Sequence, residues 1–149
     1  DVYKRQVADL LHNLNELYEH PCKSKGISCS VSTGPEKLKI SADEAQLKQV
    51  LINLVKNATE ALEGKPDPKL DLAVKRILNH VSIEISDNGT GIPAEVLEKI
   101  FVPFYSTKPQ GSGIGLSLSR QIIRNHRGQI QVESEEGRGT TFKLMLPVN

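Results

Sequence analysis

Residues 69–93, KLDLAVKRILNHVSIEISDNGTGIP, decide the class of the fold. Apolar and polar residues alternate through 69–77 and again through 80–87, which predicts two half-buried strands. A short turn near 78–80 separates them, and the second strand then runs into Asp87 and a bend with two glycines. A hairpin would explain these glycines, but not the further glycine clusters GSGIGLSLSR and GRGTTF that follow in the same short chain.

The elements predicted on either side also contain strands in adjacent pairs. Predicted strands cover residues 26–32, 37–41, 128–134 and 140–147, and predicted helices cover 7–19, 94–100 and 114–124. A long helix is also predicted, with Ser41 or Asp43 as its cap and an apolar face from residue 47 to residue 62. Because the strands do not alternate singly with helices, we expect an α+β fold, a two-layer α/β sandwich. Its mixed, mostly antiparallel sheet would have the helices packed on one face.

The composition is that of an ordinary globular domain. A chain of 149 residues with 38% hydrophobic and 25% charged residues is long enough for one core and not disordered. A net charge of +1 gives no case for nucleic acid, and no apolar run is long enough to suggest direct membrane contact. Two cysteines, Cys22 and Cys29, are too few for a disulfide framework, which favours a reducing, cytoplasmic setting.

The long helix with its apolar face at 47–62 carries two asparagines on one side. Asn53 and Asn57 lie four residues apart, so their side chains project from the same face. Asparagine is an indifferent helix former, and its commonest explanation is solvent exposure. The functional alternative is that a carboxamide oxygen binds a hard cation such as Mg²⁺, which usually keeps several waters and contacts substrate phosphates.

Asp87 has an ordinary explanation, the capping of a turn, and a functional one. If its carboxylate is buried beside a flat apolar surface, it can accept a hydrogen bond from an exocyclic amine such as that of adenine. Such a site would reject a keto purine, because unmatched buried polar groups cost about 1–3 kcal/mol each. Gly89 and Gly91 would let the backbone approach the ligand, and Ile92 would cover the base.

A second glycine cluster, Gly111, Gly113 and Gly115, comes directly before the helix predicted at 114–124. Backbone N–H groups and the positive end of a helix dipole favour an anion at such a position, and phosphate is the natural candidate. On its own, a glycine loop of this kind is weak evidence for a binding site.

The stretch FVPFYSTKPQ, residues 101–110, links these two glycine clusters. It combines Phe101 and Phe104, which we expect to be hydrophobic anchors, with a polar tip that includes Lys108. This composition suits a lid over phosphates, with Lys108 reaching a transferring phosphoryl group, and it suits an ordinary surface loop equally well.

Together, these segments resemble the catalytic ATP-binding domain of sensor histidine kinases, within the GHKL superfamily of ATPases and kinases. The family's N box is similar to QLKQVLINLVKNATEAL, its first glycine box to DNGTGIP and its F box to FVPFYSTK. Its second glycine box resembles GSGIGLSLSR, and its last motif resembles GRGTTF. The five motifs follow one another over about residues 43–142, with a short lid like that of the nitrogen-regulation type.

The resemblance implies roles for individual residues. Asn57 would be the Mg²⁺ ligand and Asn53 its companion near the phosphates. Asp87 would bind the adenine amine, supported by Thr140 through a water. The other implied ATP-binding residues are Gly89, Gly91, Ile92, Thr107, Lys108, Gly111, Gly113, Gly115 and Leu116, and the implied catalytic residues are Asn53 and Lys108. Many members carry Lys three positions after the metal-binding Asn, so Glu60 puts a phosphate contact there in doubt.

The residue at position 53 separates two branches of this family. The ATP-hydrolysing members have Glu one turn before the Mg²⁺-binding Asn, where this chain has Asn53. A neutral carboxamide cannot act as a general base, so we expect slow hydrolysis and favour phosphoryl transfer to a nucleophile. In the family that nucleophile is a histidine on a helical dimerisation domain. None of the chain's histidines, His12, His20, His80 and His126, has the sequence context of a phosphoacceptor.

We therefore expect residues 1–25 to be a linker helix leading from a dimerisation domain absent from this chain. Residues 26–149 would be the catalytic domain, with ATP and Mg²⁺ as cofactors. The implied partners are the dimerisation domain and a response regulator, in the cytoplasm, and the sequence leaves open whether the parent protein is anchored in the inner membrane. Two alternatives stay open: a nucleotide-binding module without phosphotransfer, and a serine kinase on the same fold.

Overall fold

The computed structural model describes residues 3–6, 19, 22–106 and 113–148. The helix expected at 7–19 falls almost entirely outside these residues. The elements are β1 (Tyr3–Gln6), β2 (Ser28–Ser32), β3 (Lys39–Ala42), α2 (Glu44–Ala61), β4 (Lys69–Ile77), β5 (His80–Asp87), α3 (Ala94–Leu97), α4 (Gly115–Asn125), β6 (Gln129–Glu135) and β7 (Gly139–Pro147).

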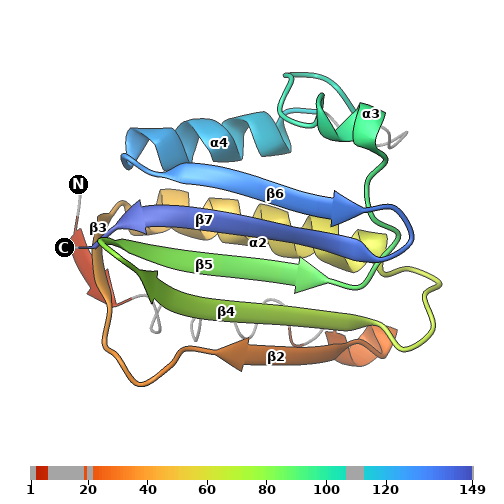
Figure 1. The fold of residues 1–149 in the computed structure, drawn as a ribbon, viewed down its shortest axis with the longest axis horizontal. Coiled ribbons are helices and arrows are strands. Elements are labelled where there is room, and N and C mark those ends of the chain that lie inside the picture. Colours follow the sequence, from red (N-terminus) through yellow and green to blue (C-terminus); the bar gives the residue numbers. More distant parts are fainter. Residues whose placement is uncertain (1–2, 7–18, 20–21, 107–112, 149) are drawn as a thin grey trace.

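Five strands form the main sheet, in the order β2-β4-β5-β7-β6 (Figure 1). All neighbours in it are antiparallel except β2 and β4, which are parallel. A parallel pair needs a long crossover connection, and the segment containing α2 provides it. The α+β class with a mixed, mostly antiparallel sheet is confirmed.

The two strands expected before the long helix do not pair with each other. β2 joins the edge of the main sheet beside β4, whereas β3 pairs antiparallel with β1 in a separate two-stranded sheet. The two strands are neighbours in sequence, but the stretch between β2 and β3 carries the chain from one sheet to the other. This difference moves β2 to an edge position and leaves the centre of the sheet to β5.

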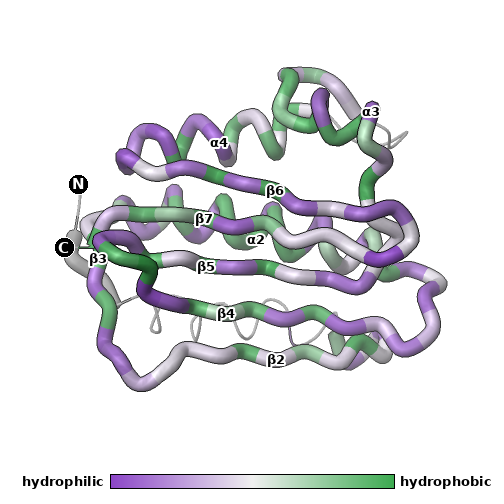
Figure 2. The backbone as a smooth tube through the Cα atoms, viewed as in Figure 1, coloured by the Kyte–Doolittle hydropathy of each residue, from purple (hydrophilic) through white to green (hydrophobic). Residues whose placement is uncertain are grey.

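The core lies between the sheet and the helices on one of its faces. α2 contacts β5 and β7, α4 contacts β6, and the two helices contact each other (Figure 1). Figure 2 shows the alternation of apolar and polar residues along the strands that produces this buried face. The fully buried side chains include Leu47, Leu51, Leu54, Leu70, Leu72, Ile83, Ile85 and Ile123. No helix among the described residues is long and apolar enough to span a membrane.

Polar groups fix one end of the helical layer, where the start of α2 meets the end of α4. Asp43, one of the two expected caps, accepts a hydrogen bond from the Gln46 N–H at 3.1 Å and so caps the first turn of α2. The backbone N–H of Asp43 in turn donates to His126 Nε2 at 3.0 Å. His126 Nδ1 lies 2.8 Å from the Ile122 carbonyl oxygen, so this ring links the start of α2 to the end of α4.

Cys22 and Cys29 form a disulfide that joins the segment before β2 to the strand itself. The expectation of a reducing setting rested on two cysteines being too few for a disulfide framework. Because these two cysteines are bonded to each other, cysteine usage no longer supports that expectation.

Candidate nucleotide site

One face of α2 runs past both glycine-rich segments. Asn53, Asn57 and Ala61 follow at intervals of four residues, so they share this face over roughly 12 Å of helix. At one end, Asn53 lies against Gly115 at the start of α4. At the other end, the Ala61 carbonyl accepts a hydrogen bond from the Thr90 N–H at 3.2 Å. The face therefore connects the two glycine segments, with Asn57 between them.

The Asn53 side chain is held by α4. Its Nδ2 donates to the Ser119 hydroxyl at 3.2 Å, and Ser119 is only 3% exposed. A Cβ at Gly115 would lie 2.7 Å from Asn53 Oδ1, so the first turn of α4 can approach the carboxamide only because residue 115 is glycine. The buried Ser119 and the close approach of Gly115 thus fix the amide of Asn53, a role for Ser119 that the sequence did not reveal. The available signal was its spacing of four from Gly115.

Asp87 ends β5 and turns its carboxylate back onto the chain. Its Oδ1 accepts from the Gly89 N–H at 2.9 Å, and the Thr140 N–H also donates to the carboxylate. Burial raises the pKa of Asp87 above its ordinary value, although both N–H groups act in the opposite direction. The desolvation of the charged carboxylate is therefore larger than the stabilisation that these two donors supply. A hydrogen-bond donor on a ligand would offset the remaining free-energy cost of desolvation.

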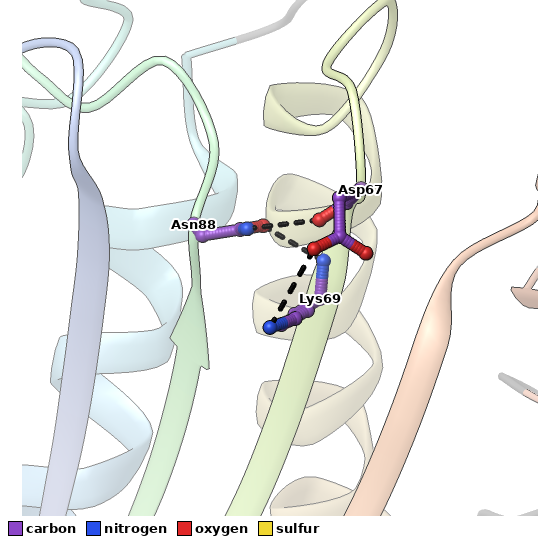
Figure 3. Close-up of polar contacts among 3 residues, drawn as sticks. All are labelled: Asp67, Lys69 and Asn88. Carbon is purple, nitrogen blue, oxygen red and sulfur yellow. Dashed lines mark hydrogen bonds and ion pairs between the residues drawn. The ribbon is translucent and has the colours of Figure 1, made fainter.

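Asn88 fixes the end of the strand that carries Asp87 (Figure 3). Its Oδ1 accepts from the Lys69 N–H at 2.7 Å, and its Nδ2 donates to the Asp67 carbonyl at 3.0 Å. Lys69 also forms an ion pair with the Asp67 carboxylate at 3.6 Å. The side chain of Asn88 is therefore engaged with Asp67 and with the start of β4, while the adjacent Asp87 pairs with Thr140 of β7.

The bend after Asp87 packs closely against two other segments. A Cβ at Gly89 would lie 2.5 Å from the Ala61 carbonyl oxygen, and one at Gly91 would overlap the Glu135 carbonyl. The Gly137 N–H donates to the Thr90 carbonyl at 2.7 Å, which joins this bend to the turn between β6 and β7. The glycines are thus required by close backbone approach in this structure.

Ile92 and Thr140 are connected through a serine. The Ser134 hydroxyl accepts from the Ile92 N–H at 2.8 Å, donates to the Gly139 carbonyl at 2.9 Å and lies 2.8 Å from Thr140 Oγ1. Thr140 is 5% exposed and lies directly opposite Asp87 in the register of β5 and β7. Ser134 was not expected to matter, and its only signal was its position near the end of a strand that leads to the GRGTTF motif.

The segment before α4 differs from one expectation. Phe101 packs partly buried against the core, with the Arg120 guanidinium 5.0 Å from its ring centre, as expected of an anchor. Phe104 is not an anchor, because it is 80% exposed. Its backbone has a positive φ of 68°, and its N–H donates to the Gly113 carbonyl at 2.8 Å. Backbone geometry therefore turns this side chain outward.

The structure describes only part of the expected phosphate-binding residues. Gly113 contacts Phe104, and Leu116 packs partly buried against the core. Thr107, Lys108 and Gly111 lie outside the described residues.

Comparison with known proteins decides the family. A family model described as histidine kinase-, DNA gyrase B- and HSP90-like ATPase matches residues 42–149. The chain belongs to this ATPase family. The catalytic domain of histidine kinase ThkA superposes with a TM-score of 0.88 at 35% identity, over 99% of this chain and 95% of that domain. Within the family, the chain is therefore a histidine kinase-type catalytic domain, and its use of a nucleotide follows from the family.

Two kinases are also similar in sequence. Sporulation kinase A of Bacillus subtilis (strain 168) is 38% identical over 139 residues, which are 93% of this chain and 22% of that protein. Sensor histidine kinase ZraS of Klebsiella oxytoca is 38% identical over 141 residues, which are 94% of this chain and 30% of that protein. This histidine kinase domain thus spans less than a third of either relative.

Proposed function

We propose that this chain binds Mg-ATP and transfers the γ-phosphate to a histidine on a separate dimerisation domain, as part of a two-component sensor kinase. The observation that carries the proposal is the face of α2 that links the Asp87 bend to the start of α4. Asp87, which would recognise the base, lies near one end of this face, and the start of α4 with its glycines lies at the other end. A nucleoside triphosphate bound along the face would reach both. The position at which hydrolysing relatives carry an acid is occupied by Asn53.

At the base end, Asp87 would accept the adenine amine, with Thr140 beside it and Gly89, Gly91 and Ile92 shaping the surroundings. The raised pKa of Asp87 supports this role, because a buried acceptor without enough donors gains most from a ligand amine. A keto purine offers no donor at that position. Adenine is therefore the base that we expect this end to select.

At the phosphate end, Asn53, Gly113, Gly115 and Leu116 would adjoin the phosphates, together with Thr107, Lys108 and Gly111. N–H groups at the start of α4 favour an anion, and this helix is 11 residues long. Lys108 would meet the transferring phosphoryl group. In phosphoryl transfer the protein mainly positions groups and stabilises charge, so these residues need no covalent step of their own.

Asn57 would hold the magnesium ion. A carboxamide oxygen is a hard donor that suits Mg²⁺, and Asn57 lies between the base end and the phosphate end of the same helix face. Among the described residues, no group of three or more His, Cys, Asp or Glu could hold a metal. A single Asn ligand is compatible with an ion that keeps several waters and binds through substrate phosphates. When bound, the ion would offset phosphate charge.

Two solved relatives support the proposed partners. ThkA was solved in complex with the response regulator TrrA, and full-length ShkA in complex with AMPPNP. For this chain we infer a response regulator and a dimerisation domain as partners. Residues 1–25 would connect to that domain, and residues 26–149 would form the catalytic unit. The need for ATP supports a cytoplasmic location.

Calorimetry with ATP and MgCl₂ tests the binding step. The wild-type chain is expected to bind ATP, Asp87→Asn to lose binding without unfolding, and Asn57→Ala to lose the dependence of affinity on Mg²⁺. Unchanged ATP affinity in Asp87→Asn would refute the assignment of the base end.

A second assay tests the transfer step. The chain is mixed with a dimerisation domain from a histidine kinase relative and radiolabelled ATP, and the label on the protein is then treated with acid. Acid-labile phosphate on histidine supports the proposal. Acid-stable phosphate would favour a serine kinase, and binding without any transfer would favour a nucleotide-binding module.

A further inference from the structure

The Ser134 hydroxyl has more neighbours than its single proton can serve. It lies within hydrogen-bond distance of the Ile92 N–H, the Gly139 carbonyl and Thr140 Oγ1. A serine hydroxyl offers one donor and two acceptor lone pairs. All three contacts can therefore be hydrogen bonds at once only if Ser134 donates in one of them and accepts in the other two.

The chemistry of the neighbours leaves one such combination. The Ile92 N–H can only donate, so it takes one lone pair of Ser134. The Gly139 carbonyl can only accept, so it takes the proton of Ser134. The remaining contact, at 2.8 Å, is then made by the Thr140 hydroxyl as donor to the second lone pair. Thr140 consequently has only lone pairs to present elsewhere.

Thr140 lies where this restriction affects the base. It is directly opposite Asp87 in the strand register, so the two side chains are on the same side of the sheet. The Thr140 N–H also donates to the Asp87 carboxylate, which places the residues in contact. With its proton committed to Ser134, Thr140 adds a second side-chain acceptor next to that of Asp87.

We propose that Ser134 is a specificity-determining residue that keeps the Thr140 hydroxyl an acceptor toward the base and so excludes 6-oxo purines. The inference rests on the proposed function, because it presupposes a purine beside Asp87. A 6-amino group or a water can donate to these acceptors. A 6-oxo group would meet lone pairs on both residues. Without Ser134, the Thr140 hydroxyl can rotate and donate to that oxygen.

The test compares ATP with ITP, which has an oxo group at position 6. Dissociation constants are measured by calorimetry for wild type, Ser134→Ala and Ser134→Thr. We expect the preference for ATP over ITP to fall about fivefold to tenfold in Ser134→Ala, the equivalent of one neutral hydrogen bond. Ser134→Thr keeps the hydroxyl on a strand that tolerates β-branching, so it should keep the wild-type preference.

A double-mutant cycle with Thr140→Val separates this role from a merely structural one. If Ser134 acts through the Thr140 hydroxyl, Ser134→Ala has no further effect on the preference once that hydroxyl is gone. If the Ala variant does not fold, Ser134→Cys keeps the shape with a much weaker hydrogen-bonding group and is used instead.

Two results would overturn the proposal while ATP binding stays intact. One is a wild-type preference for ATP over ITP in Ser134→Ala, or in Ser134→Cys where that variant replaces it. The other is an equal loss of preference on removing the Ser134 hydroxyl with and without the Thr140 hydroxyl. If the wild-type chain binds no ATP at all, the proposed function and this inference fail together.

Discussion

At the scale of single residues, the burial of Asp87 is unfavourable for folding and favourable for ligand binding. Its carboxylate is desolvated by the surrounding structure, and the N–H groups of Gly89 and Thr140 compensate for only part of that effect. An unliganded domain therefore contains an acid whose charged form is less favourable than in the unfolded chain. A nucleotide amine donating to this acid would recover part of the difference on binding.

This balance predicts how stability depends on pH. Burial raises the pKa of Asp87 above its ordinary 3.8, so the folded chain binds this proton more tightly than the unfolded chain does. Its contribution to stability is fully present below pH 3.8 and is lost as the pH rises through the raised pKa. As the pH rises from acid towards neutrality, the free energy of unfolding of Asp87→Asn should therefore increase relative to that of wild type.

Urea unfolding of both proteins across that pH range, without nucleotide, measures the difference. Other groups titrate equally in the two proteins and cancel. A difference that does not change with pH would mean that the pKa of Asp87 is not raised in the folded chain.

A second residue-scale prediction concerns Gly91. Its φ is +73°, and a Cβ there would overlap the Glu135 carbonyl, whereas Gly137 has a φ of +86° with no atom within 4 Å of such a Cβ. Gly137→Ala should destabilise by about 1–2 kcal/mol, the strain of a left-handed residue alone. Gly91→Ala should destabilise by about 1–3 kcal/mol more, because steric overlap is added.

Thermal and urea unfolding of both variants would show the difference, with Gly137→Ala as the matched control because it adds backbone strain without steric overlap. Equal destabilisation would mean that the turn between β6 and β7 shifts to accommodate the Cβ at position 91 at no cost in free energy.

At the scale of elements, α2 carries the proposed metal ligand, so its start has to be well defined. Asp43 caps it through the Gln46 N–H, and the Asp43 backbone N–H also donates to His126 at the end of α4. The cap thus serves the helix, and the backbone contact serves the packing of two helices.

Replacing the cap should separate these two functions. Asp43→Ala removes only the side-chain acceptor and should lower the free energy of unfolding by about 1 kcal/mol, whereas Asp43→Asn should be nearly neutral. Chemical denaturation gives both values. A loss in Asp43→Asn as large as that in Asp43→Ala would show that the charge, and not the cap, is what matters.

At the scale of the whole molecule, the sheet order sets where the fold is most stable. β5 is paired on both sides, with β4 and β7, and contains the fully buried Ile83, while β2 lies at an edge. Strands at the centre of a core open only with global unfolding, whereas edges open locally. The proposed base-recognising acid is placed at the end of this central strand.

Native-state hydrogen exchange should show this order. We expect the amides of β5 to exchange with the free energy of global unfolding and those of β2 to exchange at a lower free energy. Protection in β2 equal to that in β5 would contradict the prediction and would mean that the edge strand unfolds only with the core.

Local patterns account for most of what could be predicted here. Alternation and helical periodicity placed β4, β5, β6, β7 and α2 close to their observed bounds, since each depends on residues that are neighbours in sequence. The order of the glycine and asparagine motifs was likewise a local property and indicated the family. The raised pKa of Asp87 agrees with the burial that its proposed role requires.

Contacts between distant segments were decided only by the tertiary structure. The parallel pairing of β2 with β4, the exposure of Phe104 and the Cys22–Cys29 disulfide have no signal in local periodicity. The same holds for the bond of Asn53 to Ser119, 66 residues away, and for that of Ile92 to Ser134, 42 residues away. The sequence by itself determined which side chains could do the chemistry. Packing determined their partners, because a hydrogen bond between remote residues forms only after the core has brought their backbones together.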